Sequence, residues 1–192
     1  MAARMTRNLH PWLVSFLILA VAAAWLLADG RAPLAPSGRI LLWYDDPWGA
    51  EGSQHLFDWY SPSHLIHGLL FYAGLWLVAR RLAIGWRFAL AVLVECTWEL
   101  VENSDAVIER YRTATVSKDY LGDTVLNSVA DVVCMALGFW LARRLPVWIS
   151  AALILLFEVV TVWLIRDGLA LNVLMLLWPV EAVREWQAVA AG

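Results

Sequence analysis

The chain alternates between long apolar segments and shorter polar ones. Apolar residues dominate residues 12–28, 62–81, 86–103, 122–143 and 146–165, and a shorter apolar stretch covers 169–180. A helix needs about 20 apolar residues to cross a bilayer, whereas a stretch of about 10–14 is more often interfacial or re-entrant. The pattern therefore predicts an all-α polytopic transmembrane bundle of five or six spans, forming a single membrane domain over residues 1–192.

Two polar segments interrupt this pattern. Residues 29–61 are rich in proline and aromatic side chains, which is typical of a loop that lies along a membrane interface. The polar stretch 104–121 is predicted to contain no span. The first loop also carries four titratable residues that could cover a site, but we interpret them as part of a solvated loop: Asp45, Asp46, His55 and Asp58.

Composition supports a membrane location. The chain of 192 residues is 61% hydrophobic and only 16% charged, and it contains 13 Trp. Soluble domains are on average about 45–50% apolar and about 25% charged, and Trp is enriched at membrane interfaces. The expected partner is thus the lipid bilayer, with a soluble helical bundle as the alternative. The 14 basic residues form no run that would bind nucleic acid.

Arginines predict the orientation of the bundle. If the helices alternate, one side of the membrane receives a set of clustered arginines at helix ends: Arg4, Arg7, Arg80, Arg81, Arg87, Arg143 and Arg144. By the positive-inside rule that side is cytoplasmic. Residues 29–61 and 104–121 would then face the outside.

Acidic residues occupy one face of the apolar segment 86–103. Glu95, Glu99 and Glu102 lie within an arc of about 60° at the helical repeat. A carboxylate in hydrocarbon is costly, so intramembrane acids mark a functional site by default. The next predicted helix also carries polar residues on one face: Asp123, Asn127 and Asp131 lie within an arc of about 80°.

The two helices are consecutive and should run antiparallel, so depth can be counted from their outer ends at about 1.5 Å per residue. The count pairs Glu102 with Asp123, Glu99 with Asn127, and Glu95 with Asp131. We interpret these pairs as a polar ladder between the two helices. Its deepest pair, Glu95 with Asp131, is expected to be a protonated hydrogen-bonded pair.

Two histidines on the segment 62–81 lie near the same outer end. His64 and His67 are three residues apart and share a helix face. No Lys or Arg lies inside 88–103 or 122–142, so the carboxylates need protons, a metal ion, or a basic side chain reaching in from Arg110, Arg112 or Lys118.

Three interpretations follow. In the first, one divalent metal ion is bound near the outside and activates water for hydrolysis, with Glu99, Glu102 and Asp123 as candidate catalytic groups. In the second, the ladder of Glu95, Asn127 and Asp131 carries protons or cations. In the third, the polar groups only specify helix packing. The substrate, a small molecule or a lipid, is not identified. The candidate metal ligands are His64, His67, Glu99, Glu102 and Asp123.

Several sequence runs resemble an uncharacterised (UPF/DUF) family of small bacterial multi-pass membrane proteins. These runs are residues 43–45, 61–68, 98–104, 108–112 and 119–128, and the resemblance covers nearly the whole chain. It implies a location in the bacterial inner membrane and no established activity.

A more distant resemblance is to the VanZ-like membrane proteins. In that family a His-bearing helix, an acid-bearing helix, and a helix with Asp, Asn and Gly follow in order. The matching positions here are His64 and His67, then Glu95 or Glu99, then Asp123, Asn127 and Gly138. The spacing to Gly138 is longer than in that family, and the Gln expected after the Glu is absent.

Overall fold

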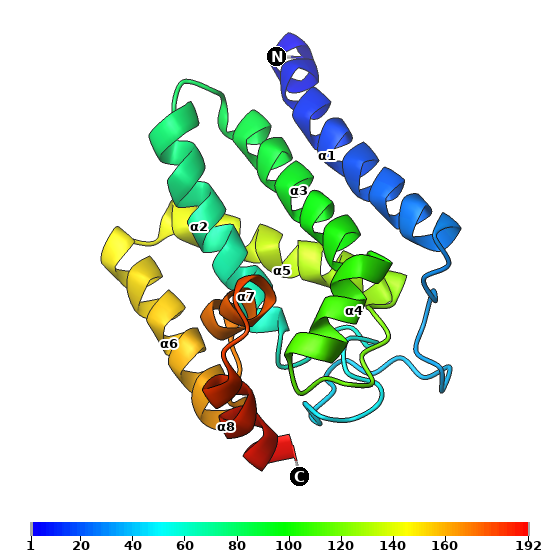
Figure 1. Ribbon diagram of the computed structural model, residues 1–192. Helices are drawn as coiled ribbons and strands as arrows, with labels where there is room; N and C mark the ends of the chain where they lie inside the picture. The colour runs from blue at the N-terminus through cyan, green and yellow to red at the C-terminus, as the bar shows by residue number, and fades with distance from the viewer. Residues whose placement is uncertain (1, 192) are drawn as a thin grey trace.

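The computed structural model describes the backbone of residues 2–191 and the side chains of residues 10–189, and it confirms the all-α fold class (Figure 1). Within that part of the chain no strand is present, and one isolated bridge joins Trp43 to Phe57. The helices are α1 (Ala2–Ala28), α2 (Ser61–Ala79), α3 (Ile84–Glu102), α4 (Asp105–Ala114), α5 (Val125–Arg144), α6 (Val147–Ile165), α7 (Leu169–Leu177) and α8 (Glu181–Ala191).

Four of these helices are long and apolar enough to cross a membrane: His10–Ala28 of α1, and all of α2, α5 and α6. The helix α3 has the same length as α2 and α6 but carries Arg87 and three glutamates, and it is not among the four. It packs between α1 and α5, and α2 packs on α3, α5 and α6. If α3 and the short α7 are counted with these four helices, the arrangement is consistent with the predicted five to six spans.

One predicted boundary is wrong, and one further helix, which is too short to be a span, was not predicted. The polar stretch 104–121 contains α4, which begins with Asp105 in its first turn and ends with Arg112 in its last turn, and these charges favour the helix dipole. The last apolar stretch ends as a helix at Leu177, before Pro179, because proline cannot continue a helix. A separate amphipathic helix, α8, follows it.

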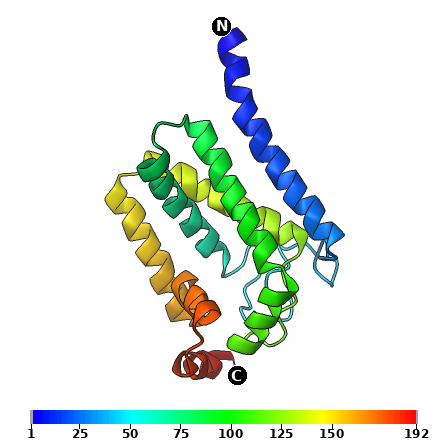
Figure 2. The same ribbon diagram turned by 45° about the horizontal axis from the view of Figure 1, so that its top comes forward.

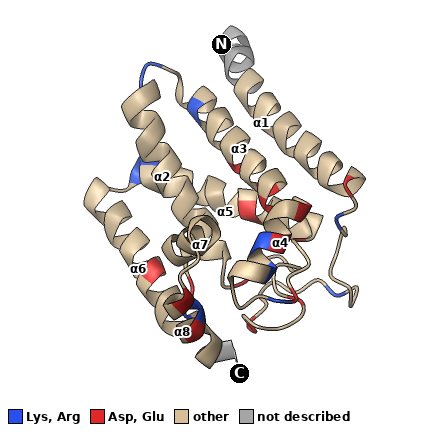
Figure 3. Ribbon diagram, viewed as in Figure 1, with Lys and Arg blue, Asp and Glu red and all other residues tan. Residues whose placement is uncertain are grey.

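Acidic residues gather toward one end of the bundle, whereas Lys and Arg occur at both ends (Figure 3). The α2–α3 and α5–α6 connections lie at the same end as the N-terminus, opposite the loop 29–60 and helices α4, α7 and α8 (Figure 2). The described arginines of the predicted cytoplasmic set occupy that first end: Arg80, Arg81, Arg87, Arg143 and Arg144. The side chains of Arg4 and Arg7 lie outside the described residues.

The loop 29–60 covers the start of α5. The first backbone N–H groups of a helix have no partner within it. Here Val125 N donates to the Ala32 carbonyl at 2.9 Å, Leu126 N donates to the Pro33 carbonyl at 3.3 Å, and the Thr124 side chain caps Asn127 N. The loop is therefore a structural cap on the outer end of α5.

The prediction of a solvated loop is wrong for two of the four candidate residues named in it. Asp45 and Asp46 are exposed, but His55 is 1% exposed and Asp58 is 5% exposed. The Asp58 carboxylate accepts hydrogen bonds from Ser53 N and Tyr60 N, which explains how it is accommodated in the interior. Burial raises the pKa of Asp58.

The helices α2 and α5 touch through two glycines. A Cβ on Gly68 would overlap the Met135 carbonyl oxygen, and a Cβ on Gly138 would overlap the Leu65 carbonyl oxygen. Small residues at a helix contact let the backbones approach closely. This contact holds α2 against α5 next to His67, one residue before Gly68.

We expect Gly68→Ala to lower the apparent melting temperature of the protein in detergent, followed by circular dichroism. The added methyl must push α2 and α5 apart, and overpacking of this kind costs about 1–3 kcal/mol. The matched control is Gly74→Ala on the same helix, where a Cβ meets nothing within 4 Å. That control should melt at or above the wild-type temperature, because Ala favours helix over Gly by about 1 kcal/mol. Equal melting of the two variants would contradict the close contact.

Candidate functional site

The candidate functional site lies where α2, α3 and α5 meet. The i, i+3 and i, i+4 spacings place His64 and His67 on one face of α2, and the glutamates on one face of α3, so both sets point into the interface. Glu95 is 0% exposed and Glu99 is 1% exposed. Asp131 on α5 completes the cluster and is also buried. Together with the half-buried His67 and Glu102, these groups form what we call the acidic–imidazole cluster: His64, His67, Glu95, Glu99, Glu102 and Asp131.

Glu95 binds both histidines. His64 Nδ1 lies 2.7 Å from Glu95 Oε1, and His67 Nδ1 lies 3.0 Å from Glu95 Oε2. A carboxylate oxygen accepts hydrogen bonds, so each Nδ1 carries the hydrogen. This arrangement leaves the Nε2 atom of His64 available as an acceptor or ligand, 3.8 Å from Asp131 Oδ2.

Two other carboxylates of the cluster lack hydrogen bonds. Neither oxygen of Glu99 has a hydrogen-bond partner among the described residues, although Glu99 Oε1 lies 3.5 Å from His64 Nδ1. The Oδ1 atom of Asp131 has none either. Buried carboxylate oxygens without partners are costly, and a proton or a bound cation would remove that cost.

The side chains offer two overlapping sets of ligand atoms. His64, His67 and Glu95 form one set, and His64, Glu99 and Glu102 form the other; within each set the ligand atoms lie within 4.8 Å of one another. The first set is already joined by short hydrogen bonds. The second contains the unpartnered Glu99, so it is the better candidate to hold an ion.

Tyrosine hydroxyls close the outer side of the cluster. Tyr111 on α4 donates to Glu102 Oε1 at 2.7 Å and lies 2.8 Å from Asn172 Oδ1 on α7. Tyr120 donates to Asp123 Oδ1 at 2.7 Å, and Asn103 Nδ2 lies 2.8 Å from the other Asp123 oxygen. Burial raises the pKa of Tyr111 and Tyr120 well above their usual value, so both hydroxyls keep the proton that they donate.

Arginines near the outer end do not reach the cluster. Arg110 Nε donates to the Leu176 carbonyl at 2.9 Å, and Arg112 Nε donates to the Tyr120 carbonyl at 2.7 Å. Both side chains therefore tie surface segments together. Among the described side chains, the ion-pair contacts of the cluster are with His64 and His67.

The structure divides the five candidate metal ligands into three places. His64, Glu99 and Glu102 come together, His67 is held by Glu95, and Asp123 lies with Asn103 and Tyr120. The members of the predicted ladder also have other partners. Glu95 binds the histidines rather than Asp131, and Asn127 Nδ2 donates to the His55 carbonyl at 2.8 Å.

Sequence reasoning missed three groups that border the cluster: Asn103, Tyr111 and Asn172. Asn103 follows the last glutamate of α3 directly, and that position is a signal that could have found it. Tyr111 and Asn172 lie on separate short helices, and nothing in the local pattern joins them to Glu102.

A family model described as "Protein of unknown function (DUF2585)" matches residues 26–189. The chain is 62% identical over 183 residues to a UPF0314 protein of Paracoccus denitrificans, which covers 95% of each chain. It is 53% identical over 167 residues to a UPF0314 protein of Novosphingobium aromaticivorans, covering 84% of each chain. A UPF0314 protein of Agrobacterium fabrum is 47% identical over 187 residues, covering 97% of this chain and 94% of the relative.

No solved structure matches the chain. The resemblance to an uncharacterised UPF/DUF family is confirmed by these findings, whereas the likeness to VanZ-like proteins stays a prediction. The names of the relatives describe no activity, so the chemistry of the cluster is the guide to function.

Carboxylates also hold α7 against the outer side of the bundle. Glu158 on α6 accepts hydrogen bonds from the first N–H groups of α7, Leu169 N at 2.8 Å and Ala170 N at 3.1 Å. Asp167 accepts hydrogen bonds from Gly168 N at 2.8 Å and from the Tyr60 hydroxyl at 3.3 Å. Burial, together with the Glu158 charge, raises the pKa of Asp167 from 3.8 to about 6.

The raised pKa of Asp167 predicts that this residue stabilises the fold less as the pH rises. Between pH 3.8 and about 6 the folded chain holds the proton more tightly than the unfolded chain, so this contribution to the free energy of unfolding falls across that window. Asp167→Asn mimics the protonated side chain. We expect the melting temperature of the wild type to fall relative to this variant between pH 5 and pH 7.5. Identical pH profiles would contradict the shift.

Proposed function

The chain belongs to the family described as protein of unknown function (DUF2585), and from its acidic–imidazole cluster we propose that it is a metal-dependent enzyme of the bacterial inner membrane. The cluster would bind one divalent ion in the outer half of the bundle. The active side of the protein would face the outer leaflet.

The apolar helices support the membrane location. Besides four helices of spanning length, the outward faces of α1 and α6 carry large apolar side chains that would otherwise meet water. Phe16 is 67% exposed, Val21 is 65% exposed and Trp163 is 79% exposed. Soluble monomers rarely expose apolar patches of this extent, whereas lipid chains would cover them.

Glu99 is the observation that carries the metal proposal. Its carboxylate is buried, both oxygens lack hydrogen-bond partners among the described residues, and His64 and Glu102 offer further ligand atoms beside it. Mixed imidazole and carboxylate ligands suit zinc, manganese or iron. A divalent ion here would supply the missing partners of Glu99 and balance the excess of acidic over basic groups.

The hydrogen bond between His64 and Glu95 fits a ligand-orienting role. Metal-binding histidines usually donate their second ring N–H to a carboxylate, which fixes the tautomer and the ring orientation. Glu95 accepts from His64 Nδ1 and is itself held by His67. His64 would thus be a metal ligand, and Glu95 and His67 would position it.

A bound metal ion would make hydrolysis possible at this depth. Such an ion would lower the pKa of bound water to about 7, which would supply a nucleophile at neutral pH. The substrate, a small molecule or a lipid, would enter from the outer side, where Tyr111 and Asn172 border Glu102.

A second candidate role is purely structural. It is favoured by the hydrogen bonds that Glu95 makes across the α2–α3 interface and by the bond between Asn103 and Asp123. In that role Glu99 would be protonated, and its side chain would contribute only to the packing of the helices. The two candidates differ in metal content and in the response to Glu99→Gln.

We expect the protein purified in detergent to hold close to one divalent metal ion per chain, measured by inductively coupled plasma mass spectrometry. Glu99→Gln and His64→Ala should each weaken metal binding by at least tenfold, because each removes a ligand. The matched control is Glu109→Gln on α4, whose carboxylate pairs with Arg112 at the surface. The control should keep the wild-type metal content.

The structural role predicts a different result. A neutral Gln mimics a protonated Glu, so Glu99→Gln would leave the melting temperature unchanged or raise it, with no metal in either protein. Absence of stoichiometric metal from wild-type protein that was expressed with zinc, manganese and iron present would overturn the enzyme proposal.

Topology offers an independent test of the membrane proposal. A reporter enzyme that is active only outside the cytoplasm should be active when fused after Leu121 and inactive when fused after Ala83, in the α2–α3 connection beside Arg80 and Arg81. The reverse pattern would invert the orientation. Release of the full-length protein from membranes by alkaline carbonate would exclude transmembrane insertion.

A further inference from the structure

A cavity of about 620 Å³ lies between α6 and α8, away from the acidic–imidazole cluster. Ligand sites typically have volumes of about 300–1,000 Å³. Its walls are largely apolar and aromatic, with one acid and one arginine, and we call it the α6–α8 groove. The lining residues are Glu158, Val159, Val162, Trp163, Arg166 and Trp186.

The groove carries one available positive charge. Both oxygens of Glu158 already accept hydrogen bonds from the first turn of α7. The guanidinium of Arg166 lies over the Trp186 ring at 5.4 Å and donates one hydrogen bond to the Trp186 carbonyl. The ion pairs found among the described side chains do not include Arg166. An anionic group would therefore be the complementary ligand.

Arg166 also adopts a backbone conformation that is unusual for its residue type. It forms the C-cap of α6 with φ of 53°, in the left-handed region where glycine or asparagine is usual. Such strain is most often kept where the side chain has a function. The Arg166 carbonyl accepts a hydrogen bond from Gln187 Nε2 on α8, so the strained residue lies at the mouth of the groove between both helices.

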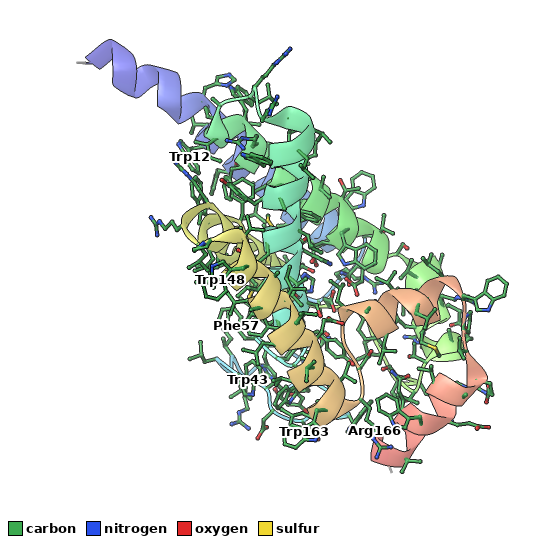
Figure 4. All side chains as sticks on the ribbon, turned by 90° about the vertical axis from the view of Figure 1, so that its left-hand side faces the viewer. Trp12, Trp43, Phe57, Trp148, Trp163 and Arg166 are labelled. Carbon is green, nitrogen blue, oxygen red and sulfur yellow. The ribbon has the colours of Figure 1, made fainter. Side chains whose placement is uncertain are left out.

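The position of the groove matches a lipid that stands in the outer leaflet. Arg166 directly follows the apolar span of α6, at the end where Trp163 also lies (Figure 4). From Arg166 to Glu158 the groove follows α6 for eight residues, about 12 Å, which fits within half of a hydrocarbon core about 30 Å thick. Its apolar wall thus lies at acyl-chain depth, and its arginine lies at head-group level.

We propose that the α6–α8 groove binds one anionic phospholipid, with an acyl chain against Val159, Val162 and Trp163 and the phosphate at Arg166. Arginine is the side chain best suited to phosphate, through its forked N–H donors. The inference rests on the proposed membrane location and not on the proposed metal centre.

Native mass spectrometry of the detergent-purified protein tests this proposal, with phosphatidylglycerol and phosphatidylcholine added at equal concentration. We expect one phosphatidylglycerol to be retained in preference to phosphatidylcholine. Arg166→Gln should reduce that preference about fivefold, the effect of one basic residue near an anionic lipid. The matched control is Arg184→Gln, which removes the same charge from α8 at a residue paired with Glu181 outside the groove. Equal retention of the two lipids by the wild type would overturn the proposal.

A second pair of variants tests the tail site without changing charge. Val162→Trp fills the groove and should reduce the retention of phosphatidylglycerol, whereas Val147→Trp, at an 87% exposed position on the same helix, should not. Equal effects of the two Trp variants would contradict an acyl-chain site even if Arg166→Gln disturbs the docking of α8. The metal content of the same samples is measured in parallel, so failure of the lipid site is distinguishable from failure of the metal centre.

Discussion

The surrounding structure must accommodate the Glu99 carboxylate, which is buried beside His64. A carboxylate with no hydrogen-bond partner among the described residues lies in the centre of a helical bundle, and Asp131 has an unpartnered oxygen nearby. Such groups are tolerated only where close packing excludes other arrangements and a proton or cation balances the charge. The Gly68–Gly138 contact supplies the close packing, because it lets α2 approach α5 with both histidines directed at α3.

The outer end of the bundle is arranged around the same constraint. Carbonyl groups of the loop 29–60 accept hydrogen bonds from the first N–H groups of α5, and the Tyr111 hydroxyl of α4 donates to Glu102. The contacts of the loop join segments that are distant in sequence, whereas Tyr111 and Glu102 lie on consecutive helices. The Tyr111 hydroxyl is therefore a donor on this side of the cluster, whereas aromatic side chains pack together nearer the α2–α3 connection: Phe88, Phe139 and Trp140.

The two proposed sites differ in chemistry. The cluster in the core has an excess of acid and suits a cation, while the groove at the periphery has an available guanidinium and suits an anion. Glu158 lines the α6–α8 groove and also caps the N-terminus of α7. Asn172 on α7 in turn accepts a hydrogen bond from Tyr111, which borders the cluster. The short α7 is therefore the physical connection between them.

The helical class, the apolar segments and the set of unusual polar residues could all be predicted from the sequence. Hydrophobic runs and the 3.6-residue period are local properties, so the faces of α2 and α3 that carry His64, His67 and the glutamates could be read directly. The family resemblance likewise depends on local runs of residues, and it is confirmed.

Which polar groups meet depends on how the helices pack in three dimensions. Depth counting paired Glu95 with Asp131, but the lateral positions of three helices place His64 between them. Burial of His55 and Asp58, the helix within 105–114, and the reach of Tyr111 and Asn172 into the site all depend on loops whose paths no periodicity specifies. The physical reason is that spacing fixes the direction of a side chain around its own helix, whereas partners are chosen by the packing of helices against one another.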